Sequence, residues 1–339
     1  MITPQLRRRF FLSLLFGLVV VTVLSFVGDA PRVLSAVAHF SWGYVPAILA
    51  LTTFNYLLRY VKWAYYLRLI GIPVSREEGF SIFACGLSMA MTPGKVGELL
   101  KAWLLRSRAG APLAVSAPVI LAERLTDGVA MLILASGGLL LYRHGWQALL
   151  VIALAAVVAV SVVQSRTLSM AVLARLETIP TVGPRVPHLR QFYESAYTLL
   201  RPRALLTALA IGVVSWSGEC VAFFLVLVGL GFSADGGLLI RAAFVLATST
   251  LVGSASLLPG GLGAAEASSA ALLKLVLPGI GGATAIAATL LIRFCTLWFG
   301  VAVGLVSLLV FGRRLGLGGN PGDKKDVPGG LDLPLAAGK

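Results

Sequence analysis

Uncharged apolar runs recur along this chain, and several of them are long enough to cross the hydrocarbon core of a membrane. A helix needs about 20 apolar residues for this crossing, and it satisfies its own backbone polar groups inside the core. Hydrophobic residues make up 58% of the 339 residues and charged residues only 12%, and the mean hydropathy is +0.91. We therefore predict an all-α polytopic integral membrane protein.

A glycine-broken segment that ends in a glutamate occurs twice, near the middle of each half of the chain. Residues 93–98 read PGKVGE, and residues 259–266 read PGGLGAAE, which keeps the same order with two extra residues before the glutamate. An arginine follows each copy within an apolar segment, Arg124 in the first half and Arg293 in the second. The pattern indicates an internal duplication. Its halves lie at about 40–163 and 204–312.

Both copies lie in segments that are otherwise apolar enough to span, residues 80–105 and 238–277. Backbone that is broken by Pro-Gly is tolerated at membrane depth only where protein or a water-filled cavity covers it. We therefore predict that each segment is a re-entrant broken helical hairpin, which returns to the side from which it entered. The residues expected to act as breaks or hinges are Pro93, Gly94, Gly97, Pro259, Gly260, Gly261 and Gly263.

About six further apolar segments are predicted to be full spans. They are residues 10–27, 44–67, 118–141, 147–163, 204–231 and 283–312. Three arginines precede the first span, and the linker 164–203 carries six arginines against two glutamates. Because cytoplasmic loops are enriched in Lys and Arg, we expect both termini and this linker in the cytoplasm. The two hairpins then enter from opposite sides, which is the inverted repeat of many secondary transporters.

The segments outside the spans limit the classes of partner. The tail, residues 316–339, is rich in glycine and proline and is expected to be disordered, beyond a membrane domain at 1–315. A net charge of +14 would suggest a nucleic-acid partner in a soluble protein. Here the basic residues cluster in loops beside apolar spans, where they favour anionic lipid head groups, and we expect no nucleic acid. The three cysteines and three histidines lack disulfide-like or metal-like spacing, so we expect no metal and no cofactor.

Ionisable side chains at membrane depth are the candidates for function. Each costs about 3 kcal/mol to place there on insertion scales, and it normally faces a cavity or a partner. The substrate-binding candidates are Lys95, Glu98, Lys101, Glu123, Arg124, Asp127, Glu219, Glu266 and Arg293. They either form ion pairs that fix the hairpins to the spans or line a polar route for a charged head group. We assign no catalytic residue.

The broken helices suggest how an anion is held. A helix that restarts after Pro-Gly offers unpaired N–H groups and the positive end of its dipole to an anion. We expect a phosphate between such a helix start and Arg124 or Arg293, whose guanidinium can hold it in a fork. Lys95 and Lys101 are expected nearby. Glu98 and Glu266 occupy corresponding places and are expected to take up and release protons as the cavity alternates.

The end of the second span is also rich in polar side chains. Arg59, Lys62 and Trp63 fall on neighbouring helical turns. We interpret the two cations as side chains that snorkel to the membrane surface, and the tryptophan as an interfacial anchor.

Three motifs occur in order along the chain, after the polar segment at 55–67: TPGKVGE at 92–98, ERLTD at 123–127 and LPGGLGAAE at 258–266. Together they resemble the lysylphosphatidylglycerol synthase transmembrane region, also called the flippase-like domain family, over roughly residues 5–315. In the two-part synthases of that family, the membrane region moves aminoacylated phosphatidylglycerol between leaflets, and a separate soluble domain attaches lysine from its tRNA. We expect no such soluble domain after Leu315, so the resemblance implies a stand-alone member and argues against lysyl transfer.

The resemblance implies translocation of a phospholipid or lipid-linked head group between the leaflets of a bacterial inner membrane, by alternating access. Relatives are also linked to hopanoids and polyprenyl-linked sugars, so the lipid stays open. An alternative is a membrane-embedded transferase or accessory protein for lipid-linked substrates, with Glu123 and Asp127 as acid, base or metal ligands. A small-solute transporter is a third hypothesis, because the same inverted repeat would serve it. The expected partners are the lipid, a second copy of the chain or a lipid-synthesis enzyme.

Overall fold

The computed structural model of the chain describes residues 29–92, 99–139, 146–312 and 314–315, and six positions between 15 and 23. Within these residues every regular element is a helix, which confirms the predicted all-α class. Apart from those six positions, the predicted first span lies outside the described residues, and so does the predicted disordered tail.

The helices follow one another with short connections. The first half holds α2 (Ala30–Ala38), α3 (Val45–Leu69), α4 (Arg76–Leu87), α5 (Leu99–Ala109), α6 (Leu113–Leu139) and α7 (Trp146–Gln164). The linker holds α8 (Arg166–Glu177) and α9 (Val186–Leu199), and the second half holds α10 (Pro202–Gly229), α11 (Gly236–Ala255), α12 (Ala264–Val276), α13 (Gly282–Arg293) and α14 (Phe299–Phe311). Short 3-10 turns are η1 (Trp42–Tyr44), η3 (Gly183–Arg185) and η4 (Pro259–Gly261). A π-helix, η5 (Phe294–Trp298), joins α13 to α14.

Three helical stretches of the described residues are long and apolar enough to cross a membrane. They are α10, α11 and the run Gly282–Phe311, which contains α13, η5 and α14. Two bent pairs raise the number to five if each is one span: α2 with η1 and α3, bent by 65°, and α7 with α8, bent by 72°. The protein is therefore an integral membrane protein with three to five candidate spans. The helix α6 has 27 residues, a length similar to that of α10, but it carries three charged side chains, Glu123, Arg124 and Asp127, and is not one of these candidates.

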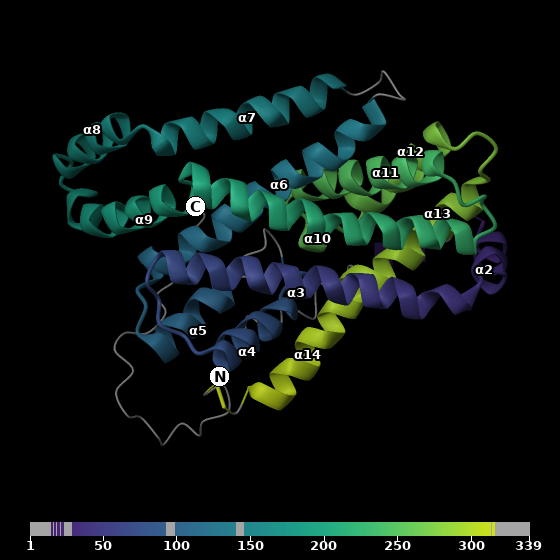
Figure 1. The fold of residues 1–339 in the computed structure, drawn as a ribbon, viewed down its shortest axis with the longest axis horizontal. Coiled ribbons are helices and arrows are strands. Elements are labelled where there is room, and N and C mark those ends of the chain that lie inside the picture. Colours follow the sequence, from purple (N-terminus) through teal and green to yellow (C-terminus); the bar gives the residue numbers. More distant parts are fainter. Residues whose placement is uncertain are drawn as a thin grey trace, which may run out of the picture.

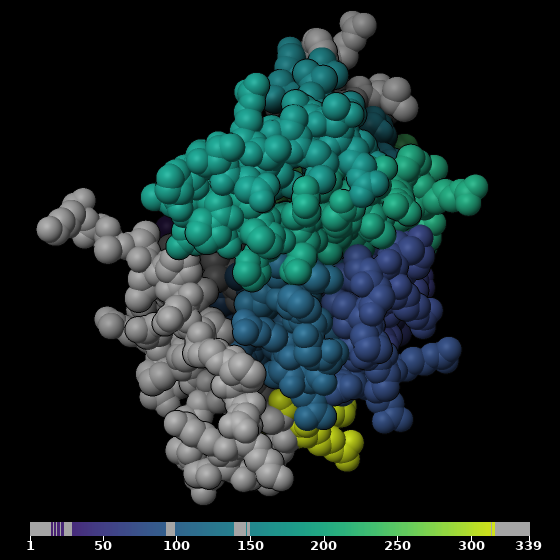
Figure 2. All heavy atoms as spheres, turned by 90° about the vertical axis from the view of Figure 1, so that its left-hand side faces the viewer, coloured from purple at the N-terminus to yellow at the C-terminus, as the bar shows by residue number. Residues whose placement is uncertain are grey.

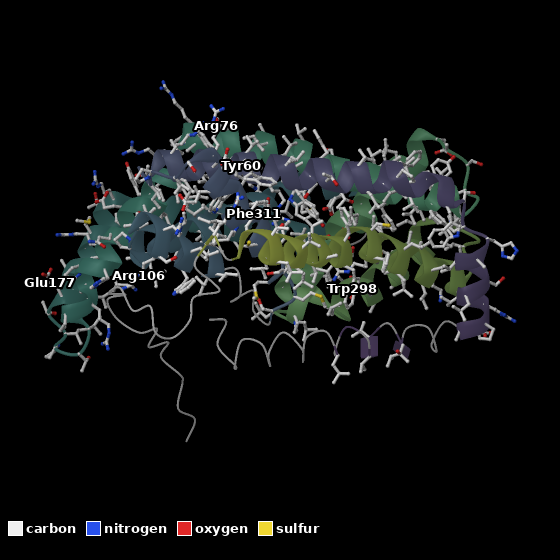
Figure 3. The ribbon with its side chains drawn as sticks, turned by 90° about the horizontal axis from the view of Figure 1, so that it is seen from below. Tyr60, Arg76, Arg106, Glu177, Trp298 and Phe311 are labelled. Carbon is white, nitrogen blue, oxygen red and sulfur yellow. The ribbon has the colours of Figure 1, made fainter. Side chains whose placement is uncertain are left out.

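The long helices α3, α7 and α10 run along the long axis of the molecule (Figure 1). The linker helices α8 and α9 lie together at one end, and α2 lies at the other. Glu177 and Arg106 lie toward the end that carries α8 and α9, and Arg76 lies farther in, in the same half of the molecule (Figure 3). Figure 2 faces this end and shows the linker helices, in teal, above the first-half helices, in blue.

Two buried apolar clusters join the helices. The larger connects α10, α11 and α13 to α6, and the smaller packs α3 against α4, α5 and α6 around Trp63. Because lipid tails are as apolar as these side chains, close packing is what holds helices together inside a membrane. The crossing of α14 and α4 illustrates this, since a Cβ at Gly304 would lie 2.0 Å from the backbone nitrogen of Ser88. Only glycine allows the two backbones to approach so closely.

Each predicted hairpin contains two helices that contact each other, α4 with α5 and α11 with α12. The two pairs lie toward opposite ends of the molecule (Figure 1). The helix α12 has 13 residues, which is too short to cross the hydrocarbon core. By contrast, α11 has 20 residues and is long enough to cross by itself.

Candidate functional site

The second glycine-broken segment is closed onto Arg293. Glu266 lies at the start of α12 and is 2% exposed. Its Oε2 accepts a hydrogen bond of 2.6 Å from the backbone nitrogen of Gly263, and its Oε1 accepts one of 2.5 Å from Nε of Arg293. Nη2 of Arg293 donates a further hydrogen bond of 2.7 Å to the carbonyl oxygen of Gly260. The arginine therefore holds both the turn and the helix that follows it.

The glycines of this segment are required by the backbone. Gly260, Gly261 and Gly263 have φ angles of 61°, 69° and 85°, a left-handed conformation that side-chain-bearing residues rarely adopt. A Cβ at Gly261 would also lie 2.9 Å from the Cα of Gly253 on α11. The predicted break at Pro259–Gly263 is thus a tight turn that packs directly on the preceding helix.

Arg293 stands at the point where the last span changes its winding. The five residues of η5 form a π-helix, which has one more residue in each turn than an α-helix and often marks a functional site. The hydroxyl of Tyr56 on α3 donates a hydrogen bond of 2.6 Å to the carbonyl oxygen of Thr296 in this π-helix. The irregular turn is thereby tied to α3, far away in the sequence.

The acids of α6 are engaged by lysines from two other helices. Nζ of Lys62 on α3 forms an ion pair with Oδ1 of Asp127, which also accepts a 3.1 Å hydrogen bond from Nε1 of Trp216. Nζ of Lys101 on α5 lies 2.7 Å from Oε2 of Glu123. All four charged side chains are less than 10% exposed. These pairs connect α6 with α3 and with the second helix of the first hairpin.

The interpretation of Lys62 and Trp63 as membrane-surface residues is wrong. Lys62 is fully buried and Trp63 is 1% exposed. A buried carboxylate, that of Asp127, lies within reach of Lys62, so the amine does not need to extend to the membrane surface. Tyr56, Arg59 and Lys62 follow one another every three residues along α3, and each makes a polar contact with another helix. This spacing was the signal that could have placed them on the inner face of α3.

A cavity of about 130 Å³ lies in the interior, between the two halves. Its charged lining residues are Arg59 of α3, Glu219 of α10 and Arg293 of α13. Hydroxyl groups and aromatic rings complete the polar part of its wall: Tyr56, Trp216, Ser249, Thr250, Ser269, Thr289 and Thr296. Arg293 therefore contacts the broken segment and faces the cavity at the same time.

Arg59 was not among the predicted site residues, yet it is a central one. The carbon at the centre of its guanidinium lies 5.7 Å from the centre of the Trp216 ring, a cation–π contact. Its Nε is buried and has no hydrogen-bond partner among the described residues. A guanidinium in this position can accept an anionic ligand that enters the cavity.

The predicted counterpart in the first half cannot be compared in full. Pro93, Gly94, Lys95, Gly97 and Glu98 lie outside the described residues. Arg124 is described and is half-buried on α6, next to Glu123. Of the seven predicted substrate-binding residues that the structure describes, Glu219 and Arg293 line the cavity.

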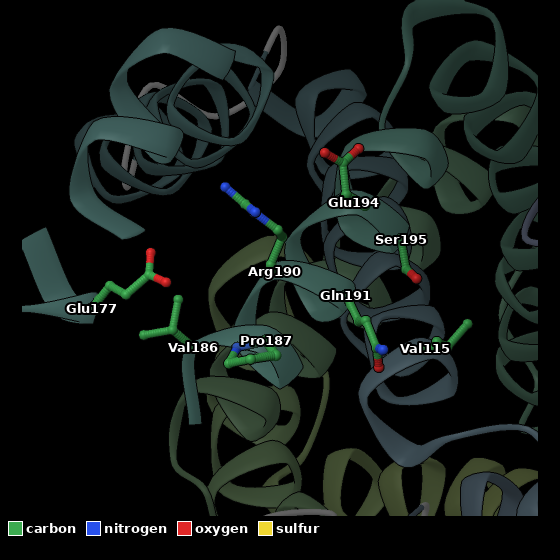
Figure 4. A pocket seen from close by; sticks show the side chains of 8 residues that line it. All are labelled: Val115, Glu177, Val186, Pro187, Arg190, Gln191, Glu194 and Ser195. Carbon is green, nitrogen blue, oxygen red and sulfur yellow. The ribbon is translucent and has the colours of Figure 1, made fainter. Parts of the chain in front are cut away.

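A larger and more open pocket, of about 510 Å³, lies at the linker end (Figure 4). It is formed by α9 together with Glu177 of α8 and Val115 of α6. Arg190 and Glu177 are exposed there, and Glu194 is already held by Arg166 through contacts of 2.7 and 2.9 Å. This pocket is a surface feature of the linker, and the interior cavity is the better candidate site.

A sequence-family model described as the lysylphosphatidylglycerol synthase TM region matches residues 11–304. The matched stretch includes the helices that line the interior cavity and the Arg293–Glu266 contact. No match was found among curated proteins.

Proposed function

Because the chain belongs to the lysylphosphatidylglycerol synthase TM-region family, we propose that it moves a lipid head group between the two leaflets of a membrane. The family connects the chain with lipid handling in general terms, and the proposal of translocation rests on the cavity. The lipid is a phospholipid or a lipid-linked glycolipid, and the membrane is a bacterial inner membrane.

The position of Arg293 is the observation that carries the proposal. Its guanidinium lines the cavity and also holds the turn of the second hairpin through Gly260 and Glu266. A phosphate that binds this arginine therefore competes with the Glu266 carboxylate and the Gly260 carbonyl oxygen, through which the arginine holds the turn. Binding of a head group and movement of the hairpin are coupled in this way, as alternating access requires.

Arg59 of α3 provides a second cation in the lining of the same cavity. Two arginines that face one cavity can hold the oxygens of one phosphate, and Arg is suited to forked contacts with phosphate. The cavity volume of about 130 Å³ is small. We therefore infer that it receives the polar head group, while the acyl or prenyl chains stay in the lipid.

The arrangement of the helices supports an inverted repeat as part of the same proposal. The pairs α4–α5 and α11–α12 lie toward opposite ends of the molecule, and the arginine-rich linker lies at the α4–α5 end. With six full spans, both termini and this end would face the cytoplasm. Each hairpin then closes one side of the cavity.

The experiment is leaflet exchange of labelled lipids in proteoliposomes. The panel contains phosphatidylglycerol, phosphatidylethanolamine and a polyprenyl phosphate. We expect exchange of at least one lipid by the wild type. We expect a loss of about tenfold or more in Arg293→Ala and in Arg59→Ala, since a hydrogen bond to a charged group contributes about 1.5–3 kcal/mol.

The matched control is Arg203→Ala. Arg203 is an exposed arginine on α10 and does not line the cavity. Its replacement should leave the exchange rate unchanged. Absence of exchange for every lipid, in a protein that remains folded, would contradict the proposal.

The alternative, a membrane-embedded transferase, assigned acid, base or metal-ligand roles to Glu123 and Asp127. Both carboxylates are buried, and each forms an ion pair with a lysine, Lys101 and Lys62. A carboxylate held in this way is poorly placed to exchange a proton with a substrate. We therefore favour translocation, and turnover of a lipid-linked donor by the purified chain would reverse this choice.

A further inference from the structure

Glu219 is a buried carboxylate for which the proposed transport cycle has no role so far. It lies on α10, lines the cavity and is 6% exposed. It forms no hydrogen bond and no ion pair with any of the described residues. A charged carboxylate without a partner in the interior of a membrane protein is costly, so an unpaired one indicates a ligand or a change of charge.

The hydroxyl groups around the cavity do not supply the missing hydrogen bond. Ser249, Thr289 and Thr296 each donate to a carbonyl oxygen of their own helix. The oxygens of these hydroxyls can accept a hydrogen bond from a protonated carboxyl group. A protonated Glu219 therefore has hydroxyl oxygens on this wall to which it can donate.

The thiol of Cys220 is the neighbour of Glu219 on α10, and four ionisable groups of other helices also act on Glu219: Tyr56 and Arg59 of α3, Asp127 of α6 and Arg293 of α13. The cavity residues of α11 and α12 are not ionisable. Three of these four groups already have a hydrogen-bond or ion-pair partner. Tyr56 donates to Thr296, Asp127 accepts from Lys62 and Trp216, and Arg293 holds Glu266 and Gly260.

Arg59 is the available partner. Its guanidinium lies over Trp216, which precedes Glu219 by three residues, one turn of the same helix. The distance between neighbouring turns is about 5 Å, which a long arginine side chain can cover by changing rotamers. Arg59 can therefore exchange a contact with the Trp216 ring for an ion pair with Glu219.

We propose that Glu219 is the proton-binding site that couples transport to pH. In one state the carboxyl group is protonated and Arg59 lies over Trp216, as in the structure. In the other state its O–H bond has broken, the proton has left to water in the cavity, and the carboxylate pairs with Arg59. One proton is bound and released in each cycle.

The net charge of the cavity changes when Glu219 gains or loses its proton. The link from this charge to transport rests on the proposed function. Glu266 neutralises Arg293, so the protonated state leaves the positive charge of Arg59 for an anionic head group. In the deprotonated state Glu219 neutralises Arg59, and the attraction for the head group is lost. A proton and an anionic head group therefore travel together.

This assignment differs from the sequence-based expectation that Glu98 and Glu266 exchange protons. Both carboxylate oxygens of Glu266 accept hydrogen bonds, one from Gly263 and one from Arg293. Protonation of Glu266 would break a contact on which the turn depends. Glu98 lies outside the described residues.

The first test needs no transport. The purified full chain is titrated by infrared difference spectroscopy, which detects a protonated carboxyl group, and by tryptophan emission with Trp216→Phe as the reference. We expect a carboxyl band that disappears as the pH rises, together with a change in Trp216 emission. Both signals should be absent in Glu219→Gln and present in Glu78→Gln, a control at the exposed Arg108–Glu78 contact. The same band in Glu219→Gln and the wild type would overturn the proposal.

The second test measures exchange of anionic lipid in proteoliposomes over the same pH range. Above the titration midpoint, the wild-type rate should fall by about tenfold for each pH unit, as the protonated fraction of a single group does. Whatever rate remains in Glu219→Gln should no longer depend on pH. If exchange occurs but has the same pH dependence in both proteins, the coupling is wrong and the proposed function stands. If the wild type exchanges no lipid, the proposed function fails, and the titration still decides whether Glu219 binds the proton.

Discussion

Nε of Arg293 and Oε1 of Glu266 lie 2.5 Å apart, although 27 positions separate the two residues in the sequence. The glutamate begins α12, and the arginine ends α13. Their contact therefore fixes the short helix α12, which follows the broken turn, to a candidate span. Its strength should be measurable in the stability of the whole domain.

Replacing one partner of this ion pair should destabilise the protein more than replacing both. Arg293→Met leaves the buried Glu266 without its cation, which costs about 3–5 kcal/mol for a buried pair. The double variant Arg293→Met with Glu266→Gln removes the unpaired charge and should recover part of the loss. Denaturation in detergent of the wild type, both single variants and the double variant would show this. Additive losses in the double variant would mean that the two side chains do not interact.

Gly261→Ala should destabilise the turn for two reasons, a clash and a strained backbone. Its Cβ would lie 2.9 Å from the Cα of Gly253, and the φ angle is 69°. Gly279→Ala is the matched control, because its φ angle is 87° but no atom lies within 4 Å of the added Cβ. In both variants the strained backbone should destabilise the protein by about 1–2 kcal/mol, and only Gly261→Ala is destabilised further by the clash. Equal melting temperatures for the two variants would contradict the close packing of turn and helix.

The Lys62–Asp127 ion pair should behave as a buried structural contact. Asp127→Ala leaves a lysine that is fully buried and uncompensated, and we expect a loss of about 3–5 kcal/mol. The double variant Lys62→Met with Asp127→Asn removes both charges and keeps a side-chain oxygen that can accept from Nε1 of Trp216, so it should recover much of this loss. Unfolding measurements on the wild type and the two variants test this expectation. A double variant as unstable as Asp127→Ala would show that the charges themselves are required.

Tyr56→Phe should weaken the connection between α3 and the π-helix. It removes the hydrogen bond to the carbonyl oxygen of Thr296, and the expected loss is about 1 kcal/mol or more, because that buried carbonyl loses a donor. Tyr60→Phe is the control, since its hydroxyl donates to the carbonyl of Arg76 at an exposed position. The melting temperature should fall more in Tyr56→Phe than in Tyr60→Phe. A greater loss in Tyr60→Phe would show that the π-helix does not depend on Tyr56.

Cysteine labelling from each side of the membrane tests whether the two broken segments return to the side from which they start. The three natural cysteines are buried and should not react. If the first segment is a hairpin, Glu77→Cys and Ser107→Cys react from one side, and if the second is a hairpin, Ser233→Cys and Pro278→Cys react from the other. All four positions are exposed. Labelling of one pair from opposite sides would show that its segment spans.

The sequence was sufficient for the helical class, the family and the break at Pro259–Gly263, because these depend on composition and on local rules for glycine and proline. The break at Pro93–Gly97 lies outside the described residues and stays a prediction. One of the two sequence-based alternatives was that the ionisable residues form ion pairs between the broken segments and the spans, and Arg293 and Glu266 form such a pair. Lys62 was misread because a lysine near the end of an apolar helix can either extend to the surface or find a buried acid. Only the packing of α3 on α6 decides between these outcomes. The role of Arg59 likewise depends on Trp216, which is 157 positions away in the sequence.

The π-helix at Phe294–Trp298 sets the helical phase of everything that follows it. Removing one residue from it would restore regular winding and rotate α14 relative to α13 by about 100°. Gly300 would then no longer face the hydroxyl of Tyr56, and Gly304 would no longer face the backbone of α4 at Ser88. A side chain would meet α4 where the structure has room for a hydrogen atom only. The π-helix thus fixes the rotation of α14 about its axis relative to α13. With one residue deleted, Arg293 of α13 and the glycines of α14 could not both make their present contacts.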